Sequence, residues 1–180
     1  MLEVILKKLN AEERAFITNL IDKDSLTGIF NRSFFNKRIR EEVHRSGRSG
    51  APVSLVLLDI DNFKHYQDTH NEGHLEGDRI LIEVAGQLKR GVRDYDVVCR
   101  YGGEEMAIIC PESSLSQGME IAERLRRRVI AECPVTISAG VASYPHISYD
   151  VRDLIHKADR ALYLAKKSGR NQCRAYSQAS

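Results

Sequence analysis

Two short apolar runs separated by a pair of glycines constrain the fold of this chain more than any other feature. The runs are residues 96–99 and 106–110, and Gly102 and Gly103 lie between them. Adjacent glycines between apolar runs are typical of a β-hairpin, because both central residues of the favoured tight turn have positive φ. Glycine has no Cβ, so it also lets a ligand come close to the backbone. The sequence therefore predicts two antiparallel strands joined at an accessible turn.

Two carboxylates, Glu104 and Glu105, follow these glycines directly. Successive side chains of a strand point to opposite faces, so we expect the two glutamates to have different roles. Taken alone, the motif is as expected of a hairpin with solvated acids. Features elsewhere in the chain favour a functional interpretation.

A nearly continuous apolar run over residues 53–58 predicts a strand that is buried on both faces. Asp59-Ile60-Asp61 follows, so carboxylates lie at the C-terminal end of this strand, where open α/β-type sheets bind ligands. If this strand neighbours the hairpin, Asp59 and Glu104 come together. Paired carboxylates and a backbone carbonyl suit Mg²⁺, which also binds substrate phosphates.

Three basic residues, Lys64, Lys166 and Arg170, are available to neutralise phosphate near these carboxylates. The whole set predicts a metal-assisted phosphoryl-transfer site, in which the metal acts as Lewis acid and template. Strand-end carboxylates also occur as solvated caps, and spacing alone leaves this alternative open.

The order of the remaining elements predicts an α+β fold with helices on a mostly antiparallel central sheet. Helices are expected over about 1–22, 31–44, 62–68, 75–88, 114–129 and 150–167, and further strands over 135–141 and 173–176. Residues 45–52, with two Gly and two Ser, are expected to form a flexible connection. The helix over 1–22 is either a linker or stalk before a domain over 23–180, or a helix packed on its own domain.

Composition narrows the function classes. The 180 residues are 42% hydrophobic and 29% charged, as expected of one soluble globular domain. A net charge of +2 gives no electrostatic case for binding DNA or RNA. No apolar run has membrane-spanning length and the N-terminus lacks a signal-peptide core, so we expect a cytoplasmic protein without a membrane segment.

The four cysteines are scattered and contain no C-x-x-C pair. Reduced core thiols are therefore expected rather than disulfides or a zinc site. His70 and His74 have ligand-like spacing, with His65 nearby, but their loop setting argues against a formed zinc site.

Over about residues 22–176 the chain resembles the GGDEF domain of diguanylate cyclases, on six blocks that occur in family order. These are Asp24-x-Leu26-Thr27-Gly28-x-x-Asn31-Arg32, Asp59-Ile60-Asp61-x-Phe63-Lys64, Gly73-His74-x-x-Gly77-Asp78, Arg100-Tyr101-Gly102-Gly103-Glu104-Glu105, Ser138-Ala139-Gly140-Val141-Ala142, and Ala158-Asp159-x-Ala161-Leu162-Tyr163-x-Ala165-Lys166-x-x-Gly169-Arg170-Asn171. The resemblance implies the palm-like fold of nucleotide cyclases. It also implies an enzyme that joins two GTP molecules into cyclic di-GMP, with one GTP per subunit of an antiparallel homodimer.

The resemblance implies roles for the matching residues. Asp59, the Ile60 carbonyl and Glu104 would bind two Mg²⁺ (or Mn²⁺) ions per active half-site. Glu105 would support that site or help to deprotonate the ribose 3′-hydroxyl. The remaining implied roles are phosphate binding by Asn62, Phe63, Lys64, Lys166 and Arg170, and close approach of the nucleotide to the hairpin at Gly102 and Gly103. Met106 replaces the usual Phe, a conservative apolar change on the buried side of the strand.

Two departures from the family pattern concern the purine. Gln67-Asp68 stands where the family usually has Asn-Asp, with that Asn contacting the guanine edge. The loop over 69–72 is also about two residues longer than usual. Asp78, the other expected guanine contact, is retained. Gln keeps the donor and acceptor of the amide but adds a rotatable bond, so we expect this departure to affect guanine affinity and selectivity more than the metal chemistry.

A second ligand site is implied by Arg93-Asp94-Tyr95-Asp96. In the family, an R-x-x-D motif at this offset resembles the inhibitory site that binds the cyclic di-GMP product, and Arg124 falls where a second arginine commonly joins it. Arg offers a planar fork for phosphate and guanine, and Asp accepts from guanine N–H groups. The alternative is a local Arg–Asp salt bridge on the surface.

Three functional hypotheses follow. The first is a working cyclase regulated by an upstream sensor or receiver domain. The second is a degenerate domain that binds nucleotide or cyclic di-GMP and transmits a signal. The third is a cyclase with relaxed purine selectivity. The intact metal and phosphate residues favour the first, whereas Gln67 and the longer loop favour the other two.

Overall fold

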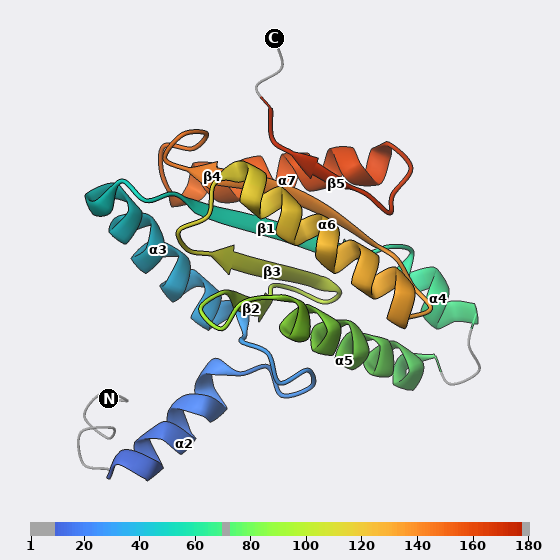
Figure 1. Ribbon diagram of the computed structural model, residues 1–180. Coiled ribbons are helices and arrows are strands. Elements are labelled where there is room, and N and C mark those ends of the chain that lie inside the picture. The colour runs from blue at the N-terminus through green and yellow to red at the C-terminus, as the bar shows by residue number, and fades with distance from the viewer. Residues whose placement is uncertain (1–9, 70–72, 178–180) are drawn as a thin grey trace.

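The computed structural model describes residues 10–69 and 73–177, which form an α+β sandwich around one sheet (Figure 1). The elements are α2 (Ala11–Asp22), α3 (Arg32–Ser49), β1 (Val53–Ile60), α4 (Phe63–Thr69), α5 (His74–Gly91), β2 (Val97–Arg100), β3 (Glu105–Cys110), α6 (Leu115–Glu132), β4 (Ile137–Tyr144), α7 (Val151–Lys167) and β5 (Cys173–Ala175). The strand order is β2-β3-β1-β4-β5, and only the β4–β5 pair is parallel. The predicted mostly antiparallel sheet with flanking helices is confirmed.

Strand β1 occupies the centre of the sheet, and all eight of its residues are buried. Its side chains alternate between two hydrophobic cores, as the period of a strand requires. Val56 and Leu58 pack with residues of α5 and α6, whereas Leu55 and Leu57 pack with residues of α3 and α7. Figure 1 shows these helix pairs covering opposite faces of the sheet. The prediction of a strand buried on both faces is confirmed.

Helix α3 is longer than the sequence predicts. It continues to Ser49, so residues 45–49 are helical and the predicted flexible connection is wrong over that part. Val43 and Ser46 are both buried, because the helix keeps its packed face beyond His44. Gly50 ends it in a left-handed conformation with φ 76°, and its N–H bonds the Ser46 carbonyl. Gly47 therefore does not end the helix, whereas Gly50 does.

The predicted hairpin between β2 and β3 is present, but its turn differs from the expected one. Residues 101–104 form a four-residue connection, and the N–H groups of Tyr101 and Gly102 both donate to the Glu105 carbonyl. Gly102 and Gly103 do not have the positive φ expected of a two-residue turn. A Cβ at Gly102 would instead come within 2.8 Å of Glu105 Oε2. Gly102 therefore lets the Glu105 carboxylate lie close to the backbone of the loop, although this flexible side chain could move away from a Cβ.

Helix α2 lies away from the sandwich in Figure 1, and Leu20 is 66% exposed. The rest of the predicted 1–22 helix, residues 1–9, lies outside the described residues. A boundary at residue 22 between a stalk and the domain stays a prediction. Within the described ranges, no helix combines the length and hydropathy needed to cross a lipid bilayer.

The four cysteines are free thiols. Cys99 and Cys110 are fully buried, while Cys133 and Cys173 are half-buried. Burial raises the pKa of the Cys99 thiol to about 12, so this side chain stays protonated and behaves as a core residue. The predicted core position is confirmed for Cys99 and Cys110, and the reduced state of the four thiols stays a prediction.

Candidate active site

The candidate site lies where the C-terminal end of β1 meets the start of β3. The two strands are antiparallel neighbours, and Asp59 is paired in register with Glu105. Glu104 immediately precedes β3, so strand alternation does not separate it from Glu105 as expected. Both glutamates are half-buried, and both are close enough to act on Asp59 electrostatically. The structure thus brings together the carboxylates that the sequence placed on separate segments.

The pKa of Asp59 is subject to opposing influences in this site. Burial raises the pKa of its carboxyl group, the ion pair with Lys166 opposes that rise, and Glu104 and Glu105 add to it. Lys166 Nζ lies 2.7 Å from Asp59 Oδ2, which joins the last turn of α7 to the central strand. One ammonium group therefore faces three acidic residues. An excess of negative charge of this kind favours a further cation.

The donor set fits the expected metal in kind. Within the described ranges, no three His, Cys, Asp or Glu side chains are grouped closely enough to hold an ion by themselves. The predicted set needs only two carboxylates, from Asp59 and Glu104, together with the Ile60 carbonyl. Mg²⁺ is commonly held by one or two carboxylates, with water and substrate phosphates as its other ligands.

The predicted phosphate-binding residues surround this strand end. Lys64 is exposed on α4, and Arg170 is exposed in the turn after α7. Asn62 joins β1 to α4 in a left-handed conformation with φ 55°. The Phe63 side chain is buried in the core, so only its backbone faces the site. Lys166 differs from the others because Asp59 already holds its ammonium group.

The predicted purine contacts lie at the other end of the site, between α4 and α5. The Gln67 side chain covers Gly77, because a Cβ placed on Gly77 would lie 2.2 Å from Gln67 Nε2. Asp78 is the next residue of α5 and is exposed, as is Asp68 on α4. The structure therefore brings Gln67 to the helix turn that carries Asp78. Residues 70–72, with His70 and most of the longer loop, lie outside the described residues.

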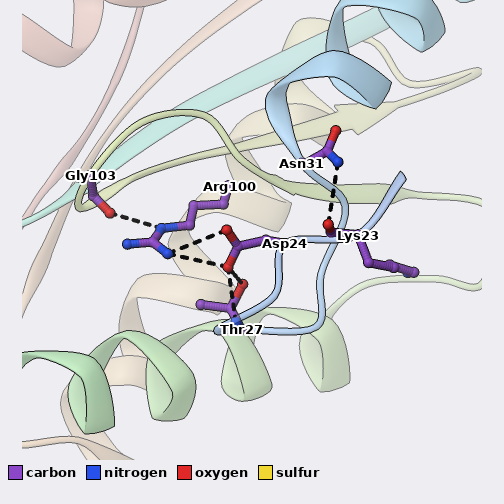
Figure 2. A network of polar contacts seen from close by, with 6 residues as sticks. All are labelled: Lys23, Asp24, Thr27, Asn31, Arg100 and Gly103. Carbon is purple, nitrogen blue, oxygen red and sulfur yellow. Dashed lines mark hydrogen bonds and ion pairs between the residues drawn. The ribbon is translucent and has the colours of Figure 1, made fainter. Parts of the chain in front are cut away.

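A polar network that the sequence did not predict fixes the hairpin loop, and Figure 2 shows it. Arg100 Nε donates to the Gly103 carbonyl at 3.0 Å, and Arg100 NH1 pairs with Asp24 at 3.2 Å. Asp24 also accepts from the N–H and hydroxyl groups of Thr27. Burial raises the pKa of Asp24, but the bonds from Thr27 and Arg100 outweigh burial and hold it below its usual value. The turn after α2 thus braces the loop that carries Glu104.

The Asn31 side chain holds the segment that joins α2 to α3. Asn31 caps α3 by accepting from the Phe34 N–H, and its amide donates to the Lys23 carbonyl (Figure 2). The only sequence signal for this network was that its residues fall within two of the ordered blocks. The pairing itself joins positions 76 residues apart, which no local pattern indicates.

Comparison with known proteins supports the same assignment. Residues 21–172 match the family model described as diguanylate cyclase, GGDEF domain. This chain belongs to the GGDEF-domain family. The match covers every element from the end of α2 to the turn after α7, including both ends of the candidate site.

Three relatives give the extent of the similarity. Diguanylate cyclase DgcP from Pseudomonas aeruginosa is 36% identical over 189 residues, covering 95% of this chain but 28% of DgcP. This chain therefore spans less than a third of that relative. The GGDEF domain of DgcB from Caulobacter crescentus, solved with c-di-GMP, has a TM-score of 0.82 and 30% identity, covering 88% and 94% of the two chains. The active GGEEF domain of a diguanylate cyclase from Vibrio cholerae has a TM-score of 0.77 and 32% identity, covering 83% and 98%.

A second candidate site of this GGDEF domain lies between the end of α5 and β2. Asp96 is buried, and its Oδ2 accepts the Arg93 backbone N–H at 3.0 Å. Its other oxygen, Oδ1, is buried and has no hydrogen-bond partner among the residues that the structure describes. Burial raises the pKa of Asp96, while the backbone bond from Arg93 and the charges of Arg93 and Arg124 oppose the rise. The structure thus brings together all three predicted residues.

The side-chain salt bridge considered as the alternative at Arg93 is not formed. The Arg93 guanidinium group donates to the Tyr95 hydroxyl at 2.9 Å instead. Arg124 donates twice to the Gly91 carbonyl. A cleft of about 180 Å³ borders Arg93 and Asp96 and is also lined by Lys23 and Lys89. The corner therefore offers a cleft with three basic side chains, Lys23, Lys89 and Arg93, beside the carboxylates of Asp94 and Asp96.

Proposed function

We propose that this GGDEF domain is a diguanylate cyclase that condenses two GTP molecules into cyclic di-GMP and two pyrophosphates. The observation that carries the proposal is the meeting of Asp59, Glu104 and Glu105 where β1 ends and β3 begins, with Lys166 as their cation. Buried carboxylates beside phosphate-binding cations suit phosphoryl transfer, in which positioning and charge neutralisation dominate. The match to an active GGEEF domain from Vibrio cholerae supports it, because this chain has the same Gly-Gly-Glu-Glu sequence.

Each copy of the chain would hold one GTP, and an antiparallel homodimer would bring two half-sites together. The 3′-oxygen of one GTP forms a bond to the α-phosphorus of the other, and the bond from that phosphorus to the pyrophosphate oxygen breaks. Glu105 helps to remove the 3′-hydroxyl proton. The same exchange in the opposite direction closes the ring and releases the second pyrophosphate.

The basic residues neutralise the phosphates of bound GTP. Lys64 and Arg170 are exposed and therefore free to reach the β- and γ-phosphates. Lys166, which pairs with Asp59 at 2.7 Å, lies beside the same carboxylate and would neutralise phosphate charge there. Asp59, the Ile60 carbonyl and Glu104 would hold Mg²⁺ or Mn²⁺, two per half-site. When bound, the metal supplies Lewis-acid polarisation of the phosphoryl oxygens.

Product analysis tests the proposal. The full chain is incubated with Mg²⁺ and GTP, ATP or an equimolar mixture, and the products are separated by chromatography. Cyclic di-GMP from GTP alone is the expected main product. Mixed or adenine-containing cyclic dinucleotides would support relaxed purine selectivity at Gln67. Absence of any product at high chain concentration, together with tight binding of GTP or cyclic di-GMP, would favour the degenerate binding module.

We also infer that the Arg93–Asp96 corner binds cyclic di-GMP and inhibits turnover. The cleft that Lys23, Lys89 and Arg93 line beside Asp96 favours this, because the phosphates of cyclic di-GMP would pair with these basic side chains. Calorimetry should find micromolar or tighter binding, about −8 kcal/mol. Arg93→Ala should lose most of that affinity and relieve inhibition that is non-competitive with GTP. Arg90→Ala, an exposed arginine one turn earlier, is the matched control and should bind as wild type does. Equal binding by all three proteins would refute the site.

A further inference from the structure

The turn that carries Arg170 has an unusual backbone. Arg170 and Asn171 both have left-handed conformations, with φ 61° and 44°, directly after Gly169 at φ 110°. Residues with a Cβ rarely adopt this region, and such conformations persist where the surroundings hold them in place. The Arg170 N–H donates to the Ala165 carbonyl at 3.1 Å, and the Gln172 carbonyl accepts from the Ala139 N–H at 3.0 Å. The turn is therefore tied to both α7 and β4.

Asp61, the second acid of the Asp59-Ile60-Asp61 motif, holds this turn from the sheet. Its side chain is buried, and its carboxylate accepts from Thr136 Oγ1 at 2.7 Å and from Ser138 Oγ at 2.6 Å. These two bonds fix the carboxylate against the start of β4. The same carboxylate then accepts the Asn171 backbone N–H at 3.0 Å. The Asp61 carboxylate accepts these three hydrogen bonds, so it holds the turn after α7 and is not one of the expected metal ligands.

Arg126 on α6 holds the same turn from the other side. Glu123 accepts two hydrogen bonds from the Arg126 guanidinium group, at 2.8 and 2.7 Å. The remaining nitrogen, NH1, donates to Asn171 Oδ1 at 2.7 Å. A guanidinium group fixed in this way by a carboxylate is a well-oriented donor. Asn171 is thus gripped at its backbone by Asp61 and at its side chain by Arg126.

Arg170 is the residue of this turn whose side chain is available to bind a ligand. Its side chain is exposed, and among the residues that the structure describes its guanidinium group has no ion-pair or hydrogen-bond partner. Lys166, one turn earlier on α7, reaches Asp59. The two acids of one motif thus attach two successive parts of the α7 C-terminus to the same strand end.

We propose that Asp61 and Arg126 are positioning residues, which hold the turn after α7 so that Arg170 points at the terminal phosphates of bound GTP. The inference rests on the proposed function, because it takes Arg170 as a phosphate ligand. The two acids then have separate tasks, Asp59 at the reacting phosphates and Asp61 behind the arginine. Neither Asp61 nor Arg126 touches the nucleotide.

Two arginines on α6 provide a matched pair for the test. Arg126 and Arg127 both pair with Glu123, but only Arg126 contacts Asn171. Calorimetry with Mg²⁺ and α,β-methylene-GTP, which cannot release pyrophosphate, measures nucleotide affinity without turnover. Arg126→Ala should weaken binding about tenfold, because misplaced ligands lose most of their contribution. Arg127→Ala should bind as wild type does.

A double variant separates positioning from general stability. If Arg126 acts through Arg170, Arg126→Ala/Arg170→Ala should bind the analogue no more weakly than Arg170→Ala alone. If the double variant instead shows the product of the two single losses of affinity, Arg126 does not act through Arg170. Equal affinity of Arg126→Ala and Arg127→Ala would also overturn the role of Arg126. Wild-type affinity in Arg170→Ala is a distinct result. It would refute the phosphate role of Arg170, and with it the positioning inference that depends on it.

Two substitutions at Asp61 complete the test. Asp61→Asn keeps an acceptor oxygen for Asn171 and should bind within about twofold of wild type. Asp61→Ala, measured below its melting temperature, should bind as weakly as Arg170→Ala. Wild-type affinity in Asp61→Ala would remove Asp61 from the inference. The comparison of Arg126 with Arg127 decides the matter if Asp61→Ala does not fold.

Discussion

The phosphate end and the base end of the candidate site are built in different ways. At the phosphate end, Asp59 belongs to the central strand, and its partner Lys166 belongs to α7. Helix α7 lies directly on β4, since a Cβ at Gly140 would be 2.1 Å from the Leu162 backbone nitrogen. At the base end, Gln67 belongs to the seven-residue helix α4 near the surface. A hydrogen bond of 3.0 Å between Tyr66 and Glu76 joins that helix to α5.

The difference teaches that the two ends tolerate change unequally. Groups on a packed central strand cannot move without repacking both cores, so the chemistry of the phosphate end is set by the fold. A short surface helix repositions its side chains at little cost. Substitutions at the base end are therefore expected to alter which nucleotide binds, whereas those at the phosphate end are expected to abolish turnover or unfold the protein.

The largest expected effect is at the phosphate end. Asp59→Ala and Glu104→Ala should each lower cyclic dinucleotide formation by about a thousandfold or more, because each removes a carboxylate proposed to hold the metal. Neither side chain fills the core, so circular dichroism should show a folded protein. Near-normal turnover by either folded variant would show that the metal is bound elsewhere.

The same substitution at two glycines compares the two ends directly. Gly140→Ala places a Cβ against α7 backbone atoms at 2.1 and 2.2 Å, and should cost about 3 kcal/mol, or roughly 10 °C in Tm. Gly77→Ala meets only the flexible side chain of Gln67, and alanine favours a helix by about 1 kcal/mol. Its Tm should therefore be unchanged or higher, while the ratio of GTP to ATP affinity changes. Similar losses of Tm in both variants would end the distinction between a rigid and an adaptable end.

A smaller effect is expected for Gln67→Asn. A shorter amide fixes one torsion fewer and should gain about 1 kcal/mol for GTP, roughly fivefold in affinity. Calorimetry with α,β-methylene-GTP measures it, with the adenine analogue as the control for base recognition. Unchanged or weaker guanine binding would mean that the loop over 69–72 has rebuilt the pocket around Gln67.

The smallest effect concerns the brace on the hairpin loop. The pKa of Asp24 is held below its usual 3.8, so its carboxylate stabilises the fold above that pH, and the contribution is lost as pH falls through the lowered pKa. Asp24→Asn should lose about 1 kcal/mol of unfolding free energy at pH 7. The difference from wild type should shrink on acidification below pH 4, as followed by urea unfolding. A difference that does not change with pH would exclude the charge of Asp24 as its cause.

The sequence predicted the central strand and its carboxylates because both signals are local. Residues 53–58 can be almost entirely apolar only where both faces of a strand are covered, and this indicated the middle of the sheet. Asp59 and Glu104 then followed from neighbouring strands. The resemblance added the purine and product residues, and the structure places them in two separate corners.

The contacts that sequence reasoning missed join distant positions through side chains. Asp61 binds donors from 75 to 110 residues later in the chain, and Arg126 reaches across 45 residues to Asn171. Nothing in the local pattern around Asp61 distinguishes it from Asp59, which lies two residues earlier on the same motif. The turn at Gly102 was mispredicted for a different reason, because its shape depends on local backbone bonds in which two N–H groups share the Glu105 carbonyl, and two adjacent glycines do not specify them.

The central position of β1 also has a consequence for biosynthesis. Chains emerge from the ribosome N-terminus first, so Asp59 and Glu104 are made well before α7. Until β4 follows, one edge of β1 is unpaired, and unpaired strand edges promote association between chains. Lys166, Arg170 and the contacts that fix their turn are added almost last. A nascent chain therefore contains the acids of the candidate site early, but the basic residues proposed to bind a triphosphate are absent until nearly all of the domain has been translated.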